Sequence, residues 1–249
     1  MAELATFVPT LIGVGLLVLI SIAVLWAFRA PRRFAPALAI LRGTIQLAIL
    51  SFILSGVITN PWWVALALVV MFVVAAVTAT RRLRWSWGRF ALVSSSMALG
   101  ILVTAVIVFG TGAIELTARF ALAIGGIVIG NSMTIATLAG RRFAEATNDH
   151  WEEVEAWLAL GATRRESTLQ LARNAVYSAL IPSTDQTKTT GLVALPGAFV
   201  GAIFGGLSPL EAGRFQIVVL ASIMAAGSIT AVVLIGVLAP VRMRPLPLA

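Results

Sequence analysis

Long uninterrupted apolar segments recur along this sequence and restrict its fold more than any other feature. Seven of them are close to the length of about 20 residues that an α-helix needs to cross the hydrocarbon core of a bilayer. We therefore expect an all-α polytopic membrane protein with about seven transmembrane helices and a single transmembrane domain over residues 1–249. The predicted spans are residues 7–27, 35–58, 62–80, 90–109, 120–138, 190–207 and 215–239.

The composition favours a membrane protein over a soluble one. Hydrophobic residues make up 59% of the chain and charged residues only 11%, whereas soluble domains carry about 25% charged residues. The chain has no cysteine, which excludes disulfides and zinc–thiolate sites. Its net charge of +8 comes from basic residues that lie between the apolar segments, which is the pattern of membrane topology and not of a nucleic-acid-binding protein.

These basic residues lie almost entirely on one side of the predicted spans. Fifteen of the 18 Lys and Arg residues fall in the loops after the first, third and fifth spans and in the C-terminal tail. Arg119 and Arg214 lie on the other side, and Arg42 lies within the second span. The positive-inside rule therefore predicts an external N-terminus and a cytoplasmic C-terminus.

One long polar segment, residues 141–189, lies on the predicted cytoplasmic side and carries a helix–turn–helix pattern. The first helix is expected to stop at Gly161, since glycine best adopts the left-handed C-terminal turn. Thr163 and Glu166 form a Thr-x-x-Glu capping box that starts a second helix. The sequence thus predicts an elbow at Gly161, Ala162 and Thr163.

Arg164 and Arg165 project at this predicted elbow and allow two interpretations. The hairpin can lie on lipid headgroups, with both arginines against phosphates. Alternatively, it is a coupling element that docks in a groove of a soluble ATPase. The physical pattern alone does not choose between them.

Polar side chains within the predicted spans are candidates for a cargo pathway, because such residues are costly in a bilayer. Arg42 and Gln46 lie one helical turn apart on one face. Each candidate also has a simpler role, since Arg42 can reach the headgroups and amide side chains can bond between helices. The candidates are Arg42, Gln46, Asn131, Ser132, Met133 and Gln216.

Residues around the sixth predicted span are candidates for a gate or hinge. Asp185 and Lys188 can form a local ion pair or a gate at the cytoplasmic mouth of that span. Glycines four residues apart share a helix face that allows close packing or sliding. The candidates are Pro182, Asp185, Lys188, Pro196, Gly197, Gly201 and Gly205.

Glu155-Ala156-Trp157 followed by Gly161 resembles the Glu-Ala-Ala…Gly cytoplasmic motif of ABC transporter permeases, with Trp157 in place of the second alanine. The family's Ile-x-Leu-Pro ending is replaced by a later Leu180-Ile181-Pro182. A closer resemblance runs over most of the chain and is densest over residues 130–216. It is carried by Gly130-Asn131-Ser132-Met133, Leu160-Gly161-Ala162-Thr163, Ala179-Leu180-Ile181-Pro182, Asp185, Lys188-Thr189, Gly191-Leu192-Val193, Leu195-Pro196-Gly197, Gly201, Gly206, Pro209, Ala212 and Gln216.

With these motifs the chain resembles the bacterial iron-export ABC permease family, which is related to a plant membrane subunit implicated in aluminium tolerance. The resemblance implies a multi-pass protein of the bacterial inner membrane, most simply a homodimer, powered by a separate ABC ATPase. The chain has no Gly-x-x-x-x-Gly-Lys-Ser/Thr loop, so ATP-Mg is expected on that partner and no cofactor on this chain. The expected ATPase contacts are Glu155, Trp157, Gly161, Ala162, Thr163, Arg164 and Arg165.

We therefore expect a permease that is not itself an enzyme and that exports iron. No Asp, Glu, His or Cys lies within a predicted span, whereas bare Fe²⁺ favours such ligands. A chelated or anionic form of iron suits the predicted lining better, and no metal-ligand set can be assigned. The alternatives are export of an organic anion such as a nucleotide sugar, and a non-transporting sensor or assembly protein whose hairpin lies on lipid.

Overall fold

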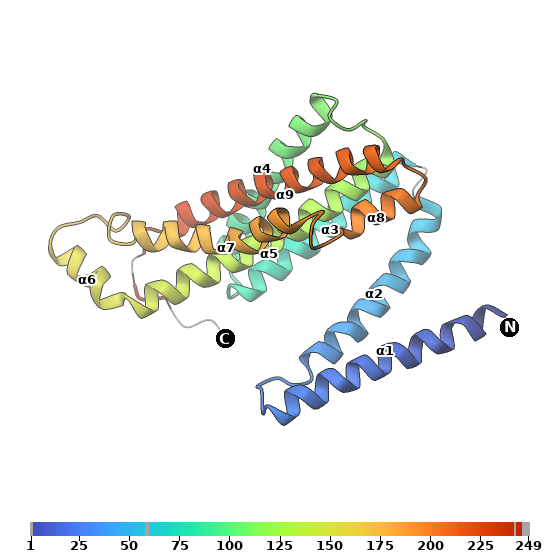
Figure 1. The fold of residues 1–249 in the computed structure, drawn as a ribbon. Coiled ribbons are helices and arrows are strands. Elements are labelled where there is room, and N and C mark those ends of the chain that lie inside the picture. Colours follow the sequence, from blue (N-terminus) through green and yellow to red (C-terminus); the bar gives the residue numbers. More distant parts are fainter. Residues whose placement is uncertain (1, 58–59, 242, 246–249) are drawn as a thin grey trace. The chain divides into compact units, whose positions relative to one another are not determined.

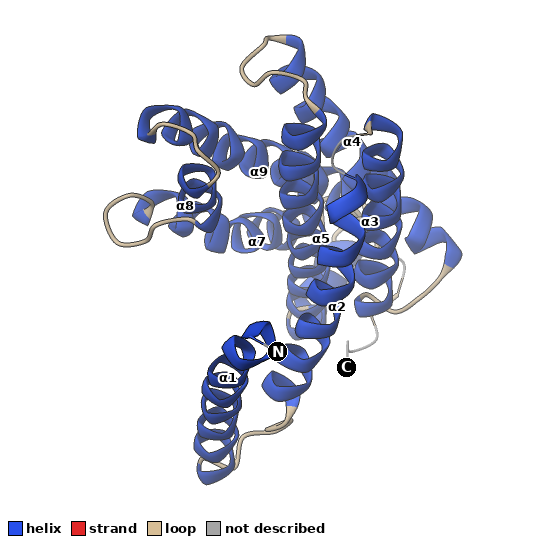
Figure 2. Cartoon of the chain, turned by 90° about the vertical axis from the view of Figure 1, so that its right-hand side faces the viewer, coloured by secondary structure: helices blue, strands red, loops and turns tan. Residues whose placement is uncertain are grey.

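The protein is all-helical over the residues that the structure, a computed structural model, describes: 2–57, 60–241 and 243–245 (Figure 1). Within these ranges Figure 2 shows helices and loops only, and Thr190 and Ala194 form an isolated bridge. The helices are α1 (Ala2–Ala27), α2 (Ala35–Val57), α3 (Pro61–Arg82), α4 (Trp87–Gly110), α5 (Ala118–Asp149), α6 (Trp151–Ala159), α7 (Leu169–Thr189), α8 (Gly197–Phe204) and α9 (Pro209–Leu238).

The chain forms two compact units, residues 1–59 and 60–249. The first contains α1 and α2, which pack against each other, and the second contains α3 to α9. Among the described residues, helices α1, α3, α4, α5 and α9 are long and apolar enough to cross a membrane, and α2 has a shorter apolar stretch, Ala35–Ile49. This is a polytopic membrane protein, as predicted, and every predicted span except 190–207 coincides with a helix.

The predicted span over residues 190–207 is wrong as a continuous helix. Gly191 adopts a φ of 86° just after α7, and Pro196 precedes α8, which is only 8 residues long. Gly206 then turns the chain with a φ of 95°. The glycines and the proline break this apolar stretch, and the helix that packs into the bundle is instead α7, in the more polar segment before it.

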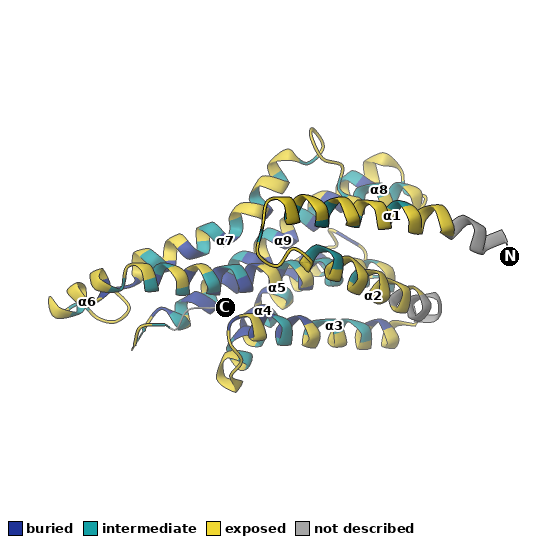
Figure 3. Cartoon of the chain, turned by 90° about the horizontal axis from the view of Figure 1, so that it is seen from below, coloured by how far each residue is buried: buried dark blue, intermediate teal, exposed yellow. Residues whose placement is uncertain are grey.

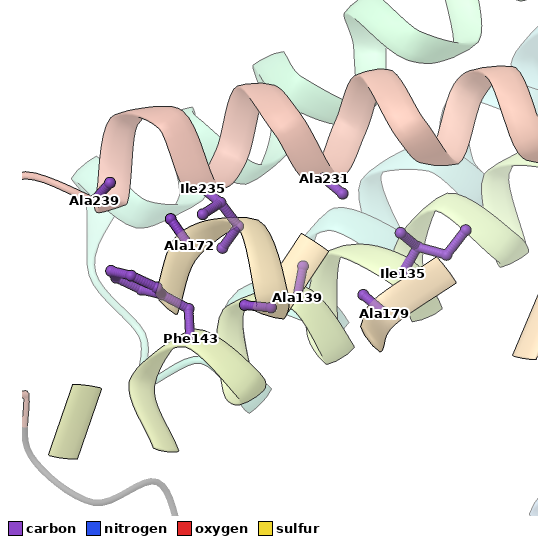
Figure 4. Packing of buried hydrophobic residues seen from close by; sticks show 9 residues of the cluster. Ile135, Ala139, Phe143, Ala172, Ala179, Ala231, Ile235 and Ala239 are labelled. Carbon is purple, nitrogen blue, oxygen red and sulfur yellow. The ribbon is translucent and has the colours of Figure 1, made fainter. Parts of the chain in front are cut away.

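Helix α7 packs against α5 and α9 through small side chains. Ala172, Ala175, Ala179 and Ser183 form its buried face. Figure 4 shows Ala172 and Ala179 of this face with Ile135, Ala139 and Phe143 of α5 and with Ala231, Ile235 and Ala239 of α9. Alanine lets helix axes approach closely, so a helix of low hydrophobicity can still join the core.

Helices α5 and α9 run parallel, and α7 runs antiparallel to both. The rings of Phe120 and Phe215 are 5.5 Å apart near the start of α5 and α9. Further along the bundle, α9 lies very close to α5 and α7 at Gly227. A Cβ atom added to this glycine would overlap Cδ1 of Ile135 on α5 and would lie 3.6 Å from Cδ2 of Leu180 on α7. In Figure 3 the buried residues gather along α5 and α9, whereas α6 is mostly exposed.

Candidate functional site

The first part of the candidate site is the short helix α6, which lies beyond the end of α5 in the second unit (Figure 1). Val154 is the buried residue of α6. Trp157 is 51% exposed and Leu160 is 81% exposed, although both are large apolar side chains. Exposed apolar groups beside charged ones are typical of a protein or membrane interaction surface.

Backbone hydrogen bonds fix the α6–α7 turn, which we define as residues 160–168. Gly161 has a φ of 91°. Its amide donates to Leu158 O at 3.1 Å, and the amide of Ala162 donates to Trp157 O at 3.0 Å. This pair of bonds is a Schellman motif, which confirms the predicted helix stop at Gly161.

The predicted Thr163–Glu166 box is also confirmed. The amide and hydroxyl of Thr163 donate to Glu166 Oε2 at 2.8 and 2.7 Å, and the Glu166 amide donates to Thr163 Oγ1 at 3.3 Å. The Thr163 hydroxyl, and then the Thr163 amide, lower the pKa of Glu166. The box holds the turn, but α7 begins only at Leu169 because residues 164–168 form turns.

The predicted ATPase contacts are therefore gathered on α6 and on one rigid turn. Glu155 is exposed, and its Oε1 accepts a hydrogen bond from Trp151 Nε1 at 2.7 Å, which orients the carboxylate along α6. Arg164 and Arg165 are exposed on the turn. The structure thus brings together exposed aromatic, aliphatic, acidic and basic groups from residues 155–165.

A contact that sequence reasoning missed connects this turn to α9. The hydroxyl of Thr168, which is fully buried, donates to Ala239 O at 2.6 Å. A second long-range contact joins the tail to the end of α5, where Arg244 donates to Oδ1 and to the carbonyl O of Asn148 at 3.1 and 3.0 Å. The partners are far apart in sequence, so no local pattern could have indicated either contact.

The second part of the candidate site is the outward face of α7. Asn174, Tyr177, Ile181, Asp185 and Lys188 recur at helical spacing, opposite the buried alanine face, and all are exposed. Polar and charged side chains on a bundle helix are expected to face water or protein and not lipid.

Asp185 and Lys188 form the local ion pair that was one of their two expected roles, with Lys188 Nζ 3.3 Å from Asp185 Oδ1. Their side chains are 59% and 69% exposed. The adjacent Thr184 Oγ1 is 4.0 Å from Met224 Sδ, near the middle of α9. Asp185 therefore lies beside the middle of α9, and not at the mouth of a continuous helix over residues 190–207 as expected.

The other predicted pathway residues are divided among several places. Ser132 and Gln216 are buried, at 1% and 6% exposure, and their Oγ and Oε1 atoms have no hydrogen-bond partner among the described residues. The half-buried Asn131 donates to Ile127 O at 2.9 Å, and Met133 packs toward α3 and α4. A pathway role for these residues stays a prediction.

Arg42 and Gln46 are exposed on α2 in the first unit, and their part in a pathway also stays a prediction. Pro182 lies within α7 without ending it. Pro196 caps the start of α8, which contains Gly197 and Gly201 and ends at Gly205. A Cβ on Gly197 or Gly201 would meet no atom within 4 Å, so this glycine face packs against nothing in the described chain.

No group of three or more His, Cys, Asp or Glu residues that could hold a metal ion occurs among the residues described.

Comparison with known proteins places this chain among membrane proteins of one family. The model of the uncharacterised protein family UPF0014 matches residues 8–241. The UPF0014 membrane protein YjkA of Bacillus subtilis is 33% identical over 219 residues, which cover 87% of this chain and 88% of the relative. The Arabidopsis thaliana protein ALUMINUM SENSITIVE 3 is 34% identical over 77% of this chain and 71% of its own length.

A third relative, from Escherichia coli, is named as the probable iron export permease protein FetB and is 28% identical over 77% of this chain and 75% of its own length. No solved structure gives a significant match. The match to the family model over nearly the whole chain, together with the apolar helices, shows that this protein is a membrane protein of the UPF0014 family.

Proposed function

We propose that this chain is the permease subunit of an ABC exporter in a bacterial inner membrane and that its cargo is iron, free or chelated. The proposal is carried by one observation, the exposed turn at Gly161 that is anchored to α9 through Thr168. The names of the relatives FetB and ALUMINUM SENSITIVE 3 support a role in metal handling.

In this proposal a separate ATPase docks on α6 and the α6–α7 turn. Trp157 and Leu160 supply exposed apolar area, and Arg164 and Arg165 supply charge. Large aromatic and Arg side chains are the types that dominate binding energy at protein interfaces. ATP-Mg binds to the partner ATPase. The ATPase dimer then closes, and this closure pushes the α6–α7 turn.

The turn then moves α7 and α9 together. Thr168 links the turn to Ala239, and Ala172, Ala175 and Ala179 link α7 to the core. Because packed cores switch between discrete arrangements and do not stretch, a displacement of the turn is passed to the bundle as a rigid shift. We place the α6 end in the cytoplasm, with the N-terminus outside, following the distribution of the basic residues.

The cargo pathway in this proposal runs along the outward face of α7 between two copies of the chain. Asp185 and Lys188 lie near the middle of the bundle, and their side chains are exposed in the single chain. Ionisable groups at that depth are expected to face a water-filled cavity or another protein surface. A homodimer whose α7 helices face each other provides both.

Two other functions are alternatives to iron export. Lys188 and Arg173 on α7, together with Arg42, favour an organic anion such as a nucleotide sugar over a bare cation. In the second alternative the protein is a non-transporting sensor or assembly factor, and its α6–α7 turn lies on lipid headgroups.

The test is ATP-driven uptake of radiolabelled iron into inverted membrane vesicles that contain this chain and its candidate ATPase. The double variant Arg164→Glu/Arg165→Glu is compared with Arg81→Glu/Arg82→Glu, another exposed pair of adjacent arginines, in the last turn of α3. We expect uptake and ATPase co-purification to be lost only in the first variant.

Co-purification without iron uptake would reject iron and direct the search to organic anions. If no ATPase associates with the unmodified protein, the permease proposal itself is wrong.

A further inference from the structure

A cavity of about 610 Å³ lies where the α3–α4 connection, α5 and the end of α9 meet the C-terminal tail. Its size is within the range of about 300–1,000 Å³ that is typical of small-molecule sites. It lies within the second unit, on the side of the bundle away from the outward face of α7, and neither the ATPase contacts nor the proposed pathway uses it.

Three arginines line this cavity, and no acidic residue does. They are Arg84 from the α3–α4 connection, Arg89 from the start of α4 and Arg244 from the tail. Among the described residues, the ion pairs involve Arg142, His150 and Lys188, so no carboxylate there pairs with any of these three arginines.

Hydrogen bonds to neutral groups hold two of these arginines in place. Arg89 Nη1 donates to the carbonyl oxygens of Leu83 and Arg84 at 2.8 and 2.9 Å. Arg244 donates to the side chain and backbone of Asn148. These bonds orient the guanidinium groups without neutralising them, so the cavity keeps an uncompensated positive charge.

Apart from Ser86, the remaining side chains of the lining are apolar. Leu92 and Val93 of α4, Phe143 of α5 and Leu238 of α9 line the cavity. Its occupant should therefore carry both a compact anionic group and a hydrocarbon part. A free inorganic anion would leave this apolar surface uncovered.

Aromatic residues place the cavity at the level of the lipid headgroups. Trp85 lines it, and the rings of Trp85, Trp87 and Phe90 form a cluster with centroids 5.5 to 6.3 Å apart. Trp side chains concentrate at the membrane–water interface, where apolar and polar surroundings meet. The phosphate of a membrane lipid lies at this depth.

We propose that this cavity binds an anionic phospholipid, with the headgroup phosphate on Arg84, Arg89 and Arg244 and the start of an acyl chain against Leu92 and Leu238. Guanidinium groups match phosphate oxygens by paired, charge-assisted hydrogen bonds, and basic pockets beside membrane helices are a known form of lipid site. The lipid joins the tail to the α3–α4 connection and stabilises the second unit.

The test is the thermal unfolding of the full chain in neutral detergent with added phosphatidylglycerol, phosphatidylcholine, glycerol phosphate or inorganic phosphate. We expect phosphatidylglycerol alone to raise the unfolding midpoint, by about 5 °C at saturation. Native mass spectrometry should show one retained anionic lipid per chain.

Three variants locate the site. Arg84→Gln/Arg244→Gln removes two of the charges, and Ala144→Phe fills the cavity from α5 without altering any charge. Both should lose the shift and the retained lipid. Arg82→Gln, an exposed arginine of the last turn of α3 outside the cavity lining, should keep both.

Equal shifts with phosphatidylcholine and phosphatidylglycerol would overturn the proposal, as would loss of the shift in Arg82→Gln. A full shift with inorganic phosphate or glycerol phosphate would show that the cavity binds a soluble anion and would overturn its assignment to a lipid.

Discussion

The hydroxyl of Thr168 donates a 2.6 Å hydrogen bond to the carbonyl oxygen of Ala239, 71 residues further along the chain. Ala239 caps the end of α9, and its carbonyl oxygen also accepts a hydrogen bond from the Val241 amide at 2.7 Å. The Thr168 hydroxyl is therefore a second donor to this buried carbonyl and ties the α6–α7 turn to the end of α9.

Thr168→Val keeps the shape of the side chain and removes this bond. We expect a loss of stability of about 0.5–1.5 kcal/mol, because one buried hydrogen bond is lost while the Ala239 carbonyl keeps the Val241 amide as a donor. ATP-driven transport should fall more than ATPase co-purification, because the docking residues are unchanged. Thr134→Val is the control, since Thr134 is exposed and donates only to Gly130 O of its own helix. Equal effects of the two substitutions would contradict the role of the Thr168–Ala239 bond.

Gly100 and Gly236 should respond in opposite directions to alanine. At Gly100 of α4 a Cβ would lie 2.5 Å from Ala226 O of α9, a backbone atom that cannot move aside. Gly100→Ala should therefore lower the unfolding free energy by about 1–3 kcal/mol. At Gly236 a Cβ meets no atom within 4 Å, so Gly236→Ala should raise it by up to about 1 kcal/mol through helix propensity. Denaturant unfolding in detergent measures both, and a stabilising Gly100→Ala would refute the close α4–α9 contact.

The Thr163–Glu166 box should weaken in acid. Its hydrogen bonds hold the pKa of Glu166 below the ordinary value of 4.5. A depressed folded-state pKa means that the box is fully stabilising above the ordinary value and that this stabilisation is lost as the pH falls through the lowered pKa. Exchange of the Thr163 amide, relative to the Ala162 amide, should therefore accelerate as the pH falls below about 4.5. Glu166→Gln should flatten this dependence, and an unchanged dependence in that variant would assign it to another group.

Separate neutralisation of Asp185 and Lys188 should reveal the charge of the cargo. If iron passes as a cation, Asp185→Asn should reduce transport at least tenfold and Lys188→Gln much less, because only the carboxylate attracts it. An organic anion should give the reverse order. ATPase co-purification serves as the control, since both residues lie far along α7 from the α6–α7 turn. Normal transport in both variants would remove the outward face of α7 from the pathway.

Local sequence patterns predicted the features of this protein that are determined locally. The apolar segments of α1, α3, α4, α5 and α9 had the length of membrane helices, and Gly161 and the Thr163–Glu166 box bonded within a few residues as expected. Each of these depends on residues that are neighbours in the chain.

The features that were missed depend on partners far away in sequence. Helix α7 is too polar to be recognised as a bundle helix, because its Ala172, Ala175 and Ala179 become core residues only when α5 and α9 are beside them. Asp185 was therefore expected at the cytoplasmic mouth of the sixth predicted span, whereas it lies on α7 within the bundle. The arginine-lined cavity likewise combines residues from the α3–α4 connection, α4, α5, α9 and the tail, and only the fold brings them together.

Helix α5 continues for 32 residues without a proline, from Ala118 to Asp149. At 1.5 Å per residue its length is about 48 Å, which exceeds the hydrocarbon core by about 18 Å. Such a rod works as a lever arm: a tilt of about 5° about one end displaces the other by about 4 Å. A small swing of α6 would then move the far end of α5 by more than the width of a water molecule, without α5 having to bend.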